Sequence, residues 1–269
     1  MKMMDARVKP GHDGKGIMTK KIIWITGASS GIGYALSLEM AARGWLVCAT
    51  ARSTDKLKAL AQENANIHAY PGDVSDQPRM EEIVAEIERE HGPVDTAVLN
   101  AGVYLQTRAV PFEREKFIEQ ININQIGAIN GLAALLPRLT QRRDGAVWIV
   151  SSITGFAGIP TAAAYGSTKA ALINMAECLK FDLDRYNVHI GVISPGFVDT
   201  PMINKNSYAK PFMLSPRQAA IRIADGMARR PFEITFPRRL AWVYKLASHL
   251  PYPLYFPLLR TIARLGGRT

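Results

Sequence analysis

Apolar residues along this 269-residue chain gather into short continuous runs, and longer stretches with apolar residues at helical spacing lie between them. The runs lie near 22–25, 45–50, 66–70, 95–99, 146–150, 188–194 and 232–236. Short continuous runs are typical of parallel strands buried on both faces, whereas the spacing in Tyr34–Arg43 and Ala162–Arg185 predicts helices. The pattern predicts a single α/β domain built on a doubly wound parallel sheet of about seven strands.

A glycine-rich run, TGASSGIG at Thr26–Gly33, joins the first predicted strand to the first predicted helix. Gly27, Gly31 and Gly33 lack a Cβ, so the backbone can bend sharply there and a diphosphate can approach it. The amides that open the helix, together with its dipole, then face the anion. The spacing is Gly-x-x-x-Gly-x-Gly and not the commoner Gly-x-Gly-x-x-Gly. Alone, these glycines would equally fit a plain strand-to-helix turn.

Further motifs follow in a fixed order and decide between these two interpretations. They are Asp73-Val74, Asn100-Ala101-Gly102, Asn124, Ser152, the pair Tyr165 and Lys169, and Pro195-Gly196 with Thr200. The set resembles the short-chain dehydrogenase/reductase family over about residues 21–236, with Ser152 at the family's usual thirteen residues before the tyrosine. The resemblance implies a Rossmann-like catalytic domain and a nicotinamide cofactor.

The resemblance also implies which residues contact that cofactor. The set is Gly27, Ser29, Ser30, Gly31, Ile32, Gly33, Arg52, Asp73, Val74, Asn100, Ala101, Gly102, Tyr165, Lys169, Pro195, Gly196, Val198 and Thr200. Within it, Asp73 is expected near the adenine amino group, and residues 100–102 near the adenine ribose. No metal is expected, since neither the two cysteines nor their surroundings have a ligand spacing.

Tyr165 and Lys169 lie four residues apart, which puts both side chains on one face of a helix. Reduction of a carbonyl needs a hydride at carbon and a proton at oxygen, so a positioned acid must stand beside the nicotinamide. The pKa of free tyrosine is about 10, and a neighbouring ammonium lowers it. We therefore predict Tyr165 as general acid/base and Lys169 as its electrostatic partner. By resemblance, Lys169 also holds the nicotinamide ribose.

Two further residues complete the predicted catalytic set. Ser152 ends an apolar strand, so its hydroxyl should reach the crevice at the strand's carboxyl end and bind the substrate oxygen. Ser151 is the alternative, but strand alternation lets only one of the two face that crevice. Asn124 matches the family asparagine that is thought to anchor a water next to Lys169. Asn122 is its alternative, and either asparagine could instead close an irregularity in a helix.

The end of the second strand bears on which nicotinamide is used. Sites that select NAD(H) place a carboxylate there to pair with the free 2′-hydroxyl. Here the strand runs into Ala51-Arg52-Ser53, and the guanidinium of Arg52 can pair with a 2′-phosphate. NADP(H) is thus favoured over NAD(H). Arg52 as a solvated residue at a helix start is the plainer alternative.

The net charge of +10 is concentrated at the two ends of the chain. We expect residues 1–20 to form a disordered extension without a signal peptide, with Met18 as an alternative start. Residues 237–269 read as a basic, amphipathic tail, in which prolines, Lys245 and His249 exclude a spanning helix. Its pieces Arg238–Leu250 and Leu254–Leu265 could lie on a membrane surface, cover the pocket or contact another subunit.

Substrate and partners are less well defined by the sequence. We expect a hydrophobic ketone, aldehyde or secondary alcohol, in an apolar pocket formed by Phe156, Phe197, Met202, Tyr208 and Phe212 under a lid over 200–217. Helices over Pro111–Arg138 and Ala162–Arg185 would pair subunits into a homo-dimer or homo-tetramer. Cys48 and Cys178 are expected to be buried thiols of a reducing compartment. The protein is expected in the cytoplasm, either free or bound peripherally to the inner face of a membrane. No segment resembles a nucleic-acid-binding module.

Two functions remain open on the sequence alone. The first is an NADP(H)-dependent oxidoreductase that interconverts a carbonyl and a secondary alcohol. The alternative is a non-catalytic, membrane-associated protein that binds nicotinamide and serves as a sensor or in assembly. Such a binding module needs only the glycine turn and Arg52, so the presence of Asn124, Ser152, Tyr165 and Lys169 favours the enzyme.

Overall fold

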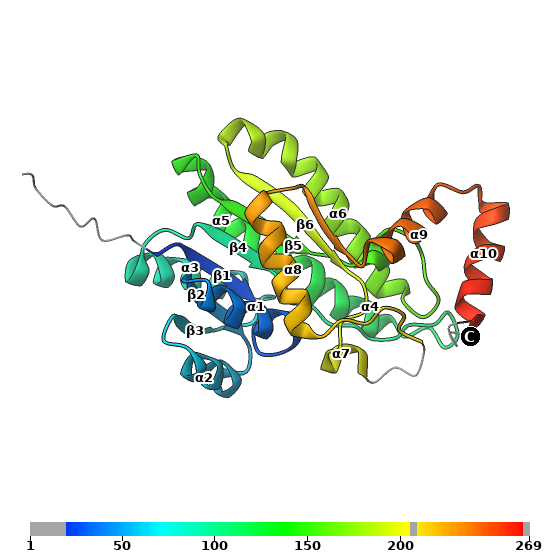
Figure 1. Cartoon of the computed structure of the whole chain (residues 1–269), viewed down its shortest axis with the longest axis horizontal. Helices are drawn as coiled ribbons and strands as arrows, with labels where there is room; N and C mark the ends of the chain where they lie inside the picture. Colours follow the sequence, from blue (N-terminus) through cyan, green and yellow to red (C-terminus); the bar gives the residue numbers. More distant parts are fainter. Residues whose placement is uncertain (1–19, 205–208, 266–269) are drawn as a thin grey trace, which may run out of the picture.

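The fold is a seven-stranded sheet covered by helices on both faces, seen in a computed structural model that describes residues 20–204 and 209–265 (Figure 1). All strand pairs are parallel, in the order β3-β2-β1-β4-β5-β6-β7. The strands are β1 Ile22–Thr26, β2 Leu46–Ala51, β3 Ile67–Pro71, β4 Thr96–Leu99, β5 Ala146–Val150, β6 His189–Pro195 and β7 Glu233–Phe236. The predicted sheet is confirmed. The predicted extension, except for Lys20, and the alternative start at Met18 lie outside the described residues.

Ten α-helices accompany these strands in the described part of the chain. They are α1 Gly31–Ala42, α2 Thr54–Glu63, α3 Gln77–His91, α4 Arg114–Gln120, α5 Gly127–Arg142, α6 Ala163–Leu183, α7 Pro201–Asn204, α8 Pro216–Arg229, α9 Arg238–Ser248 and α10 Tyr252–Leu265. A π-helical segment, Ile121–Ile126, joins α4 to α5, and 3-10 turns occupy Ile153–Gly155 and Asp184–Tyr186. The helix expected over 111–138 therefore begins at Arg114 and is interrupted by the wider turns of the π-helical segment.

Two apolar cores lie on opposite faces of the sheet because successive strand residues point to opposite sides. On one face Trp24 and Cys48 pack against α3, α5 and α6, and on the other Ile23 and Ile25 pack against α1, α2 and α8. Burial on both faces explains why the strands appear in the sequence as continuous apolar runs. Burial also raises the pKa of the Cys48 thiol. Cys178, by contrast, is exposed, which corrects the expectation that both thiols are buried.

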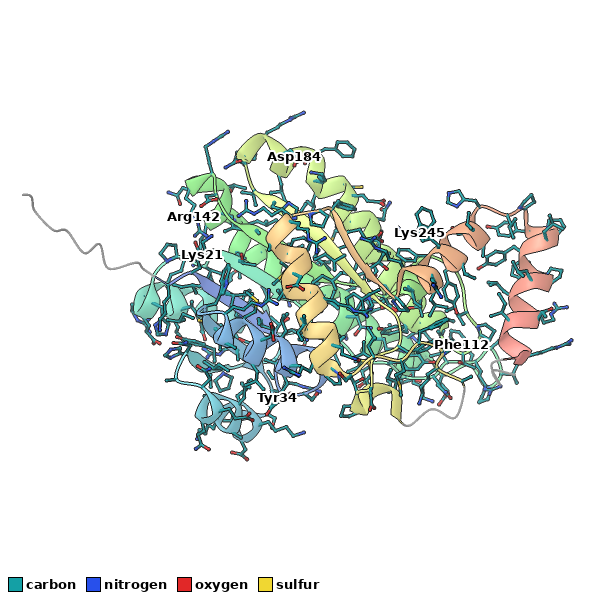
Figure 2. The ribbon with its side chains drawn as sticks, viewed as in Figure 1. Lys21, Tyr34, Phe112, Arg142, Asp184 and Lys245 are labelled. Atoms are coloured by element: carbon teal, nitrogen blue, oxygen red, sulfur yellow. The ribbon has the colours of Figure 1, made fainter. Side chains whose placement is uncertain are left out.

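A third, smaller cluster joins the end of the chain to the loop that follows β5. Ile153 and Ala157 from this loop pack against Tyr244 of α9 and Leu259 of α10. Lys245 of α9, labelled in Figure 2, pairs with Glu233 of β7 and lies 4.7 Å from the centre of the Phe156 ring. The two last helices project from the end of the molecule away from α2 and α3 (Figure 1). Residues 238–265 are thus packed on the sheet domain as two helices.

Candidate functional site

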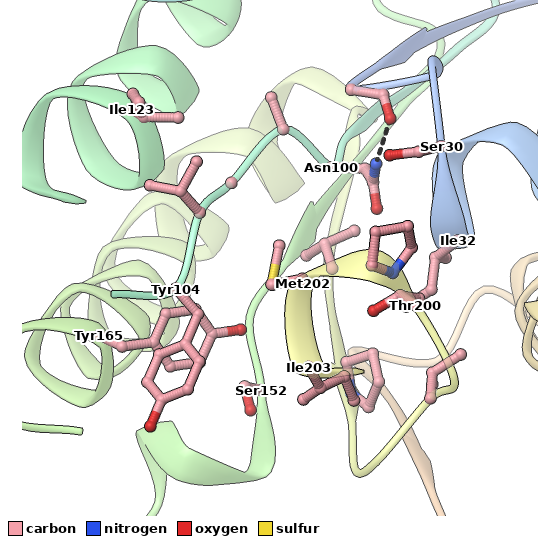
Figure 3. A pocket seen from close by; sticks show the side chains of 18 of the residues that line it. Ser30, Ile32, Asn100, Tyr104, Ile123, Ser152, Tyr165, Thr200, Met202 and Ile203 are labelled. Carbon is pink, nitrogen blue, oxygen red and sulfur yellow. Dashed lines mark hydrogen bonds between the residues drawn. The ribbon is translucent and has the colours of Figure 1, made fainter. Parts of the chain in front are cut away.

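One cavity of about 790 Å³ runs along the carboxyl ends of the strands. Ser30, Asn100 and Thr200 lie toward one end of it, and Ser152 and Tyr165 lie toward the other (Figure 3). Parallel strands present their loops at a single edge, which is where open sheets of this kind bind ligands. Most residues of the predicted site line the cavity, namely Gly27, Ser29, Ser30, Ile32, Arg52, Asp73, Val74, Asn100, Ala101, Gly102, Ser152, Tyr165, Lys169, Pro195, Gly196, Val198 and Thr200.

The glycine turn between β1 and α1 requires residues without a side chain. Gly27 and Gly31 have φ values of +69° and +58°, a region that other residues rarely adopt. A Cβ on Gly27 would come within 2.7 Å of the Ala101 Cα, and one on Gly33 within 2.4 Å of the Gly27 carbonyl oxygen. Within the described residues, the Ser30 side chain makes no capping hydrogen bond, so the opening amides of α1 stay available to an anion. The turn fits a diphosphate.

Two cationic side chains lie at the nucleotide end of the cavity. Arg52 follows β2 with its side chain 66% exposed, and Lys56 lies one turn into α2. The closest ion pair of Arg52 is with Asp73, at 3.9 Å, which is too long for a tight bond. The guanidinium can therefore turn toward a ligand at little cost. Sequence reasoning missed Lys56, which lies in the first turn of α2.

At the other end, the hydroxyls of Ser152 and Tyr165 belong to the loop after β5 and to the first turn of α6. Ser152 Oγ accepts a hydrogen bond from the Thr154 amide at 3.2 Å, which leaves its own proton to donate. Ser151 points elsewhere, since its hydroxyl donates to the Lys169 carbonyl at 2.8 Å. Both serines line the cavity, and the Ser152 hydroxyl is the one whose proton is left to donate there.

Lys169 lies fully inside the protein, next to Tyr165. Its Nζ donates to the Val150 carbonyl at 2.8 Å and lies 5.5 Å from the centre of the Tyr165 ring. Burial lowers the pKa of Lys169 from 10.5 to about 8, because removal from water penalises the ammonium form. The amine therefore changes charge within the range in which many enzymes work. In its charged form it favours the phenolate of Tyr165.

Two carboxamides hold the segment 103–105 that crosses the cavity wall. Asn124 is buried in the π-helical segment, and its side chain receives the Val103 amide at 2.7 Å and donates to the Val103 carbonyl at 3.0 Å. Gln120, one turn earlier and fully buried, makes the same pair of bonds with Leu105, both at 3.1 Å. Asn122 is exposed. Asn124 thus lies in an irregular part of a helix, as one of the two interpretations expected. It also binds the backbone of Val103 specifically.

Tyr104 lies between Val103 and Leu105, the two residues that the carboxamides bind, and it lines the cavity. Its ring meets the Tyr165 ring edge to face, with 5.1 Å between the ring centres (Figure 3). Sequence reasoning missed both Tyr104 and Gln120. The signal for Gln120 was a second carboxamide one helical turn before Asn124, but its partner at Leu105 is a backbone group and leaves no trace in the sequence.

The apolar end of the cavity differs in part from the expected pocket. Phe197 and Met202 line it, as do Leu105, Ile159 and Ile203. Phe156 instead packs with the last two helices, and Phe212 is 58% exposed, so neither belongs to the cavity. Tyr208 lies outside the described residues, as does part of the expected lid. None of the described residues of α9 and α10 lines the cavity, so these helices do not cover it.

Comparison with known proteins agrees with this geometry. A family profile described as short chain dehydrogenase matches residues 21–210. The chain belongs to the short-chain dehydrogenase family. It is an oxidoreductase with a nucleotide-binding Rossmann fold. Among the described residues, no group of three or more histidine, cysteine, aspartate and glutamate side chains is placed so that it could hold a metal ion.

Two relatives and one solved structure match most of the chain. An uncharacterized oxidoreductase of Myxococcus xanthus is 35% identical over 88% of this chain and 96% of its own. The 3-oxoacyl-[acyl-carrier-protein] reductase FabG of Thermotoga maritima is 32% identical over 69% of this chain and 77% of its own. The solved structure "ElxO with NADP Bound" is 26% identical with a TM-score of 0.72, over 80% of this chain and 97% of that one.

The clamp by Gln120 can be tested through stability. Gln120→Leu removes both hydrogen bonds to the half-buried backbone of Leu105, so we expect the free energy of unfolding to fall by about 1–3 kcal/mol in urea unfolding. Asn122→Leu, an equal change at an exposed position two residues away, should alter it by less than about 0.5 kcal/mol. Equal losses in the two variants would contradict the clamp.

Burial of Lys169 predicts a pH dependence of stability. Between pH 8 and 10.5 the unfolded chain binds a proton that the folded chain has lost, so the free energy of unfolding rises with pH. We therefore compare the free energy of unfolding of wild type with that of Lys169→Met. The difference, wild type minus variant, should rise across this pH interval by on the order of 1–3 kcal/mol. Denaturant unfolding of the cofactor-free protein at several pH values measures this difference. A flat or falling difference would show that Lys169 is not desolvated.

Proposed function

We propose that this protein is an NADP(H)-dependent oxidoreductase that transfers a hydride between nicotinamide and a carbonyl or secondary alcohol of an apolar substrate. The observation that carries the proposal is one continuous cavity, with a diphosphate turn and Arg52 at one end and the hydroxyls of Ser152 and Tyr165 at the other. When bound, the nicotinamide would supply or accept the hydride. The rest of the chemistry falls to the side chains of the chain.

The choice of NADP(H) rests on charge. Arg52 and Lys56 bring two cations to the place where a carboxylate would select NAD(H), and a guanidinium can bind a phosphate with two hydrogen bonds. Asp73, 3.9 Å from Arg52, lies in the loop after β3, the strand next to β2, where we expect it near the adenine amino group. The related structure with NADP bound supports the same choice. The glycine turn at Gly27–Gly33 would hold the diphosphate.

The proposed proton transfer uses three side chains. Tyr165 donates its phenolic proton to the substrate oxygen during reduction and takes it back during oxidation. Ser152 donates a hydrogen bond to the same oxygen, where negative charge develops, because the Thr154 amide already occupies one of its lone pairs. Lys169, in its ammonium form, stabilises the phenolate that remains. Asn124 has a positioning role, since its contacts are with Val103 and Thr168.

The substrate class follows from the walls of the cavity beyond Ser152. These walls are made by Tyr104, Leu105, Ile159, Phe197, Met202 and Ile203. An apolar chain or ring next to the reacting carbon fits such walls. A reductase that acts on 3-oxoacyl chains among the relatives is consistent with this class. The alternative of a non-catalytic nicotinamide sensor is not favoured, because a sensor has no need of the Ser152, Tyr165 and Lys169 arrangement.

Assembly and location stay predictions. Exposed isoleucines on the helices at 114–142, among them Ile118, Ile126 and Ile129, support pairing of subunits into a homo-dimer or homo-tetramer. We propose a cytoplasmic location and a small molecule as substrate. In the described residues, none of the helices is long and apolar enough to cross a membrane.

Turnover is the first test of the function. With NADPH and a panel of apolar ketones and aldehydes, we expect loss of absorbance of the reduced nicotinamide, and Tyr165→Phe should lower kcat by about 10²–10⁴-fold. Tyr186→Phe makes the same change at an exposed position in the 3-10 turn after α6 and should behave as wild type. Tight NADPH binding without turnover on any carbonyl of the panel would favour the binding-protein alternative.

Cofactor choice is tested at Arg52. Arg52→Glu removes a phosphate contact and adds a like charge, so kcat/KM with NADPH should fall by about tenfold to a hundredfold while that with NADH changes little. Lys58→Glu is the matched control, since it makes the same charge change nearby on α2 but outside the cavity. An equal fall with both cofactors would mean that Arg52 does not read the 2′-phosphate.

A further inference from the structure

The last two helices also carry a second set of apolar side chains that stay largely exposed in the described chain, apart from ring contacts among Tyr252, Tyr255 and Phe256. Their inner side is already buried through Ala241 and Tyr244 in α9 and through Tyr255 and Leu259 in α10. Seven large side chains nevertheless stay exposed, several by more than half: Trp242, Val243, Leu246, Tyr252, Leu254, Phe256 and Leu258. We call these seven residues the docking face. Single exposed apolar residues are ordinary, but a group of this size marks a contact surface.

The charges around the docking face have one sign. Residues 234–269 contain no Asp or Glu, and the described helices carry Arg238, Arg239, Lys245, Arg260 and Arg264. Lys245 pairs with Glu233, which leaves the four arginines around the face without an acidic partner among the ion pairs of the described residues. A face of aromatic and aliphatic groups bordered by cations has the composition of a helix that lies in a membrane interface.

We propose that α9 and α10 dock this protein on the surface of a membrane that contains anionic lipids. Headgroup phosphates attract the four arginines, while the rings of Trp242, Tyr252 and Phe256 enter the boundary between headgroups and acyl chains. A second copy of the chain is a poorer occupant, because a two-fold contact brings the same patch together with itself and so opposes like charges. Docking of this kind does not depend on the reaction that the cavity catalyses.

The inner sides of the two helices that carry the docking face contact a loop that also lines the cavity. Tyr255 of α10 accepts the Gly158 amide with its hydroxyl at 2.8 Å, and Ile153 and Ala157 of the same loop pack on the two helices. Ile153, Thr154 and Ile159 of this loop also line the cavity. Docking would therefore hold the apolar end of the cavity beside the lipid. A substrate dissolved in the bilayer would have a short path to it.

Vesicle sedimentation with the full-length protein tests the proposal. We expect binding to vesicles made from equal parts of phosphatidylcholine and phosphatidylglycerol, with weaker binding to phosphatidylcholine alone and a loss of binding as salt is raised. Brominated acyl chains in the same vesicles should quench Trp242. Trp24 and Trp148 are buried in the cores, and Trp45 directly precedes β2, away from the last two helices. Trp242→Phe should therefore remove most of this quenching.

Two double variants separate the apolar and the ionic contributions. Trp242→Ser with Phe256→Ser, and Arg239→Glu with Arg260→Glu, should each weaken binding to the anionic vesicles by about tenfold or more. Phe181→Ser on α6 and Arg222→Glu on α8 make matched changes at exposed positions elsewhere and should leave binding unchanged. Thermal unfolding and NADPH binding confirm that every variant is folded.

Three results would overturn the proposal. The first is that wild type fails to bind the anionic vesicles. The second is equal binding by wild type and both double variants. The third is a change of oligomeric state in the Trp242→Ser, Phe256→Ser variant during sedimentation without lipid, which would make a second copy of the chain the occupant of the docking face.

Discussion

The hydrogen bonds between the ends of β1 and β4 hold the site together. Thr26 Oγ1 accepts the amides of Asn100 at 3.0 Å and Ala101 at 3.2 Å, and the Asn100 side chain donates back to the Thr26 carbonyl at 2.9 Å. These bonds press the Ala101 backbone against Gly27, which is why no Cβ fits there. The glycine turn therefore cannot move without the strand that leads toward the Ser152 and Tyr165 end of the cavity.

The same strand end continues into the wall of the catalytic pocket. After Ala101 the chain enters the segment clamped by Asn124 and Gln120, and this segment sets Tyr104 against Tyr165. Each hydrogen bond in this path is of ordinary strength, worth about 1 kcal/mol. Because these bonds follow one another along one continuous stretch of backbone, together they fix the spacing between the two ends of the cavity. A cofactor long enough to join those ends meets a site of set length.

Much of the fold and of the site could be predicted from sequence because the relevant signals are local. Strands buried on both faces appear as apolar runs, and β5 lies at the predicted residues; Tyr165 and Lys169 share a helix face through simple periodicity. Gln120 escaped because its partner is a backbone group fifteen residues away. Phe156 and Cys178 were misplaced because an apolar or thiol side chain does not specify which surface it meets. Tertiary packing decides that, and the helical pattern around Cys178 allowed either side.

The cluster formed by Ile153, Ala157, Tyr244 and Leu259 has a practical consequence for anyone who shortens this protein. A version that ends after β7 would keep every strand and the whole nucleotide end. It would also uncover apolar side chains of the loop that carries Ser152, and remove the hydroxyl that binds both the amide and the carbonyl of Gly158. Such a fragment would be a poor stand-in for the intact enzyme, since its loss of activity would report a loosened loop and not a missing lipid contact.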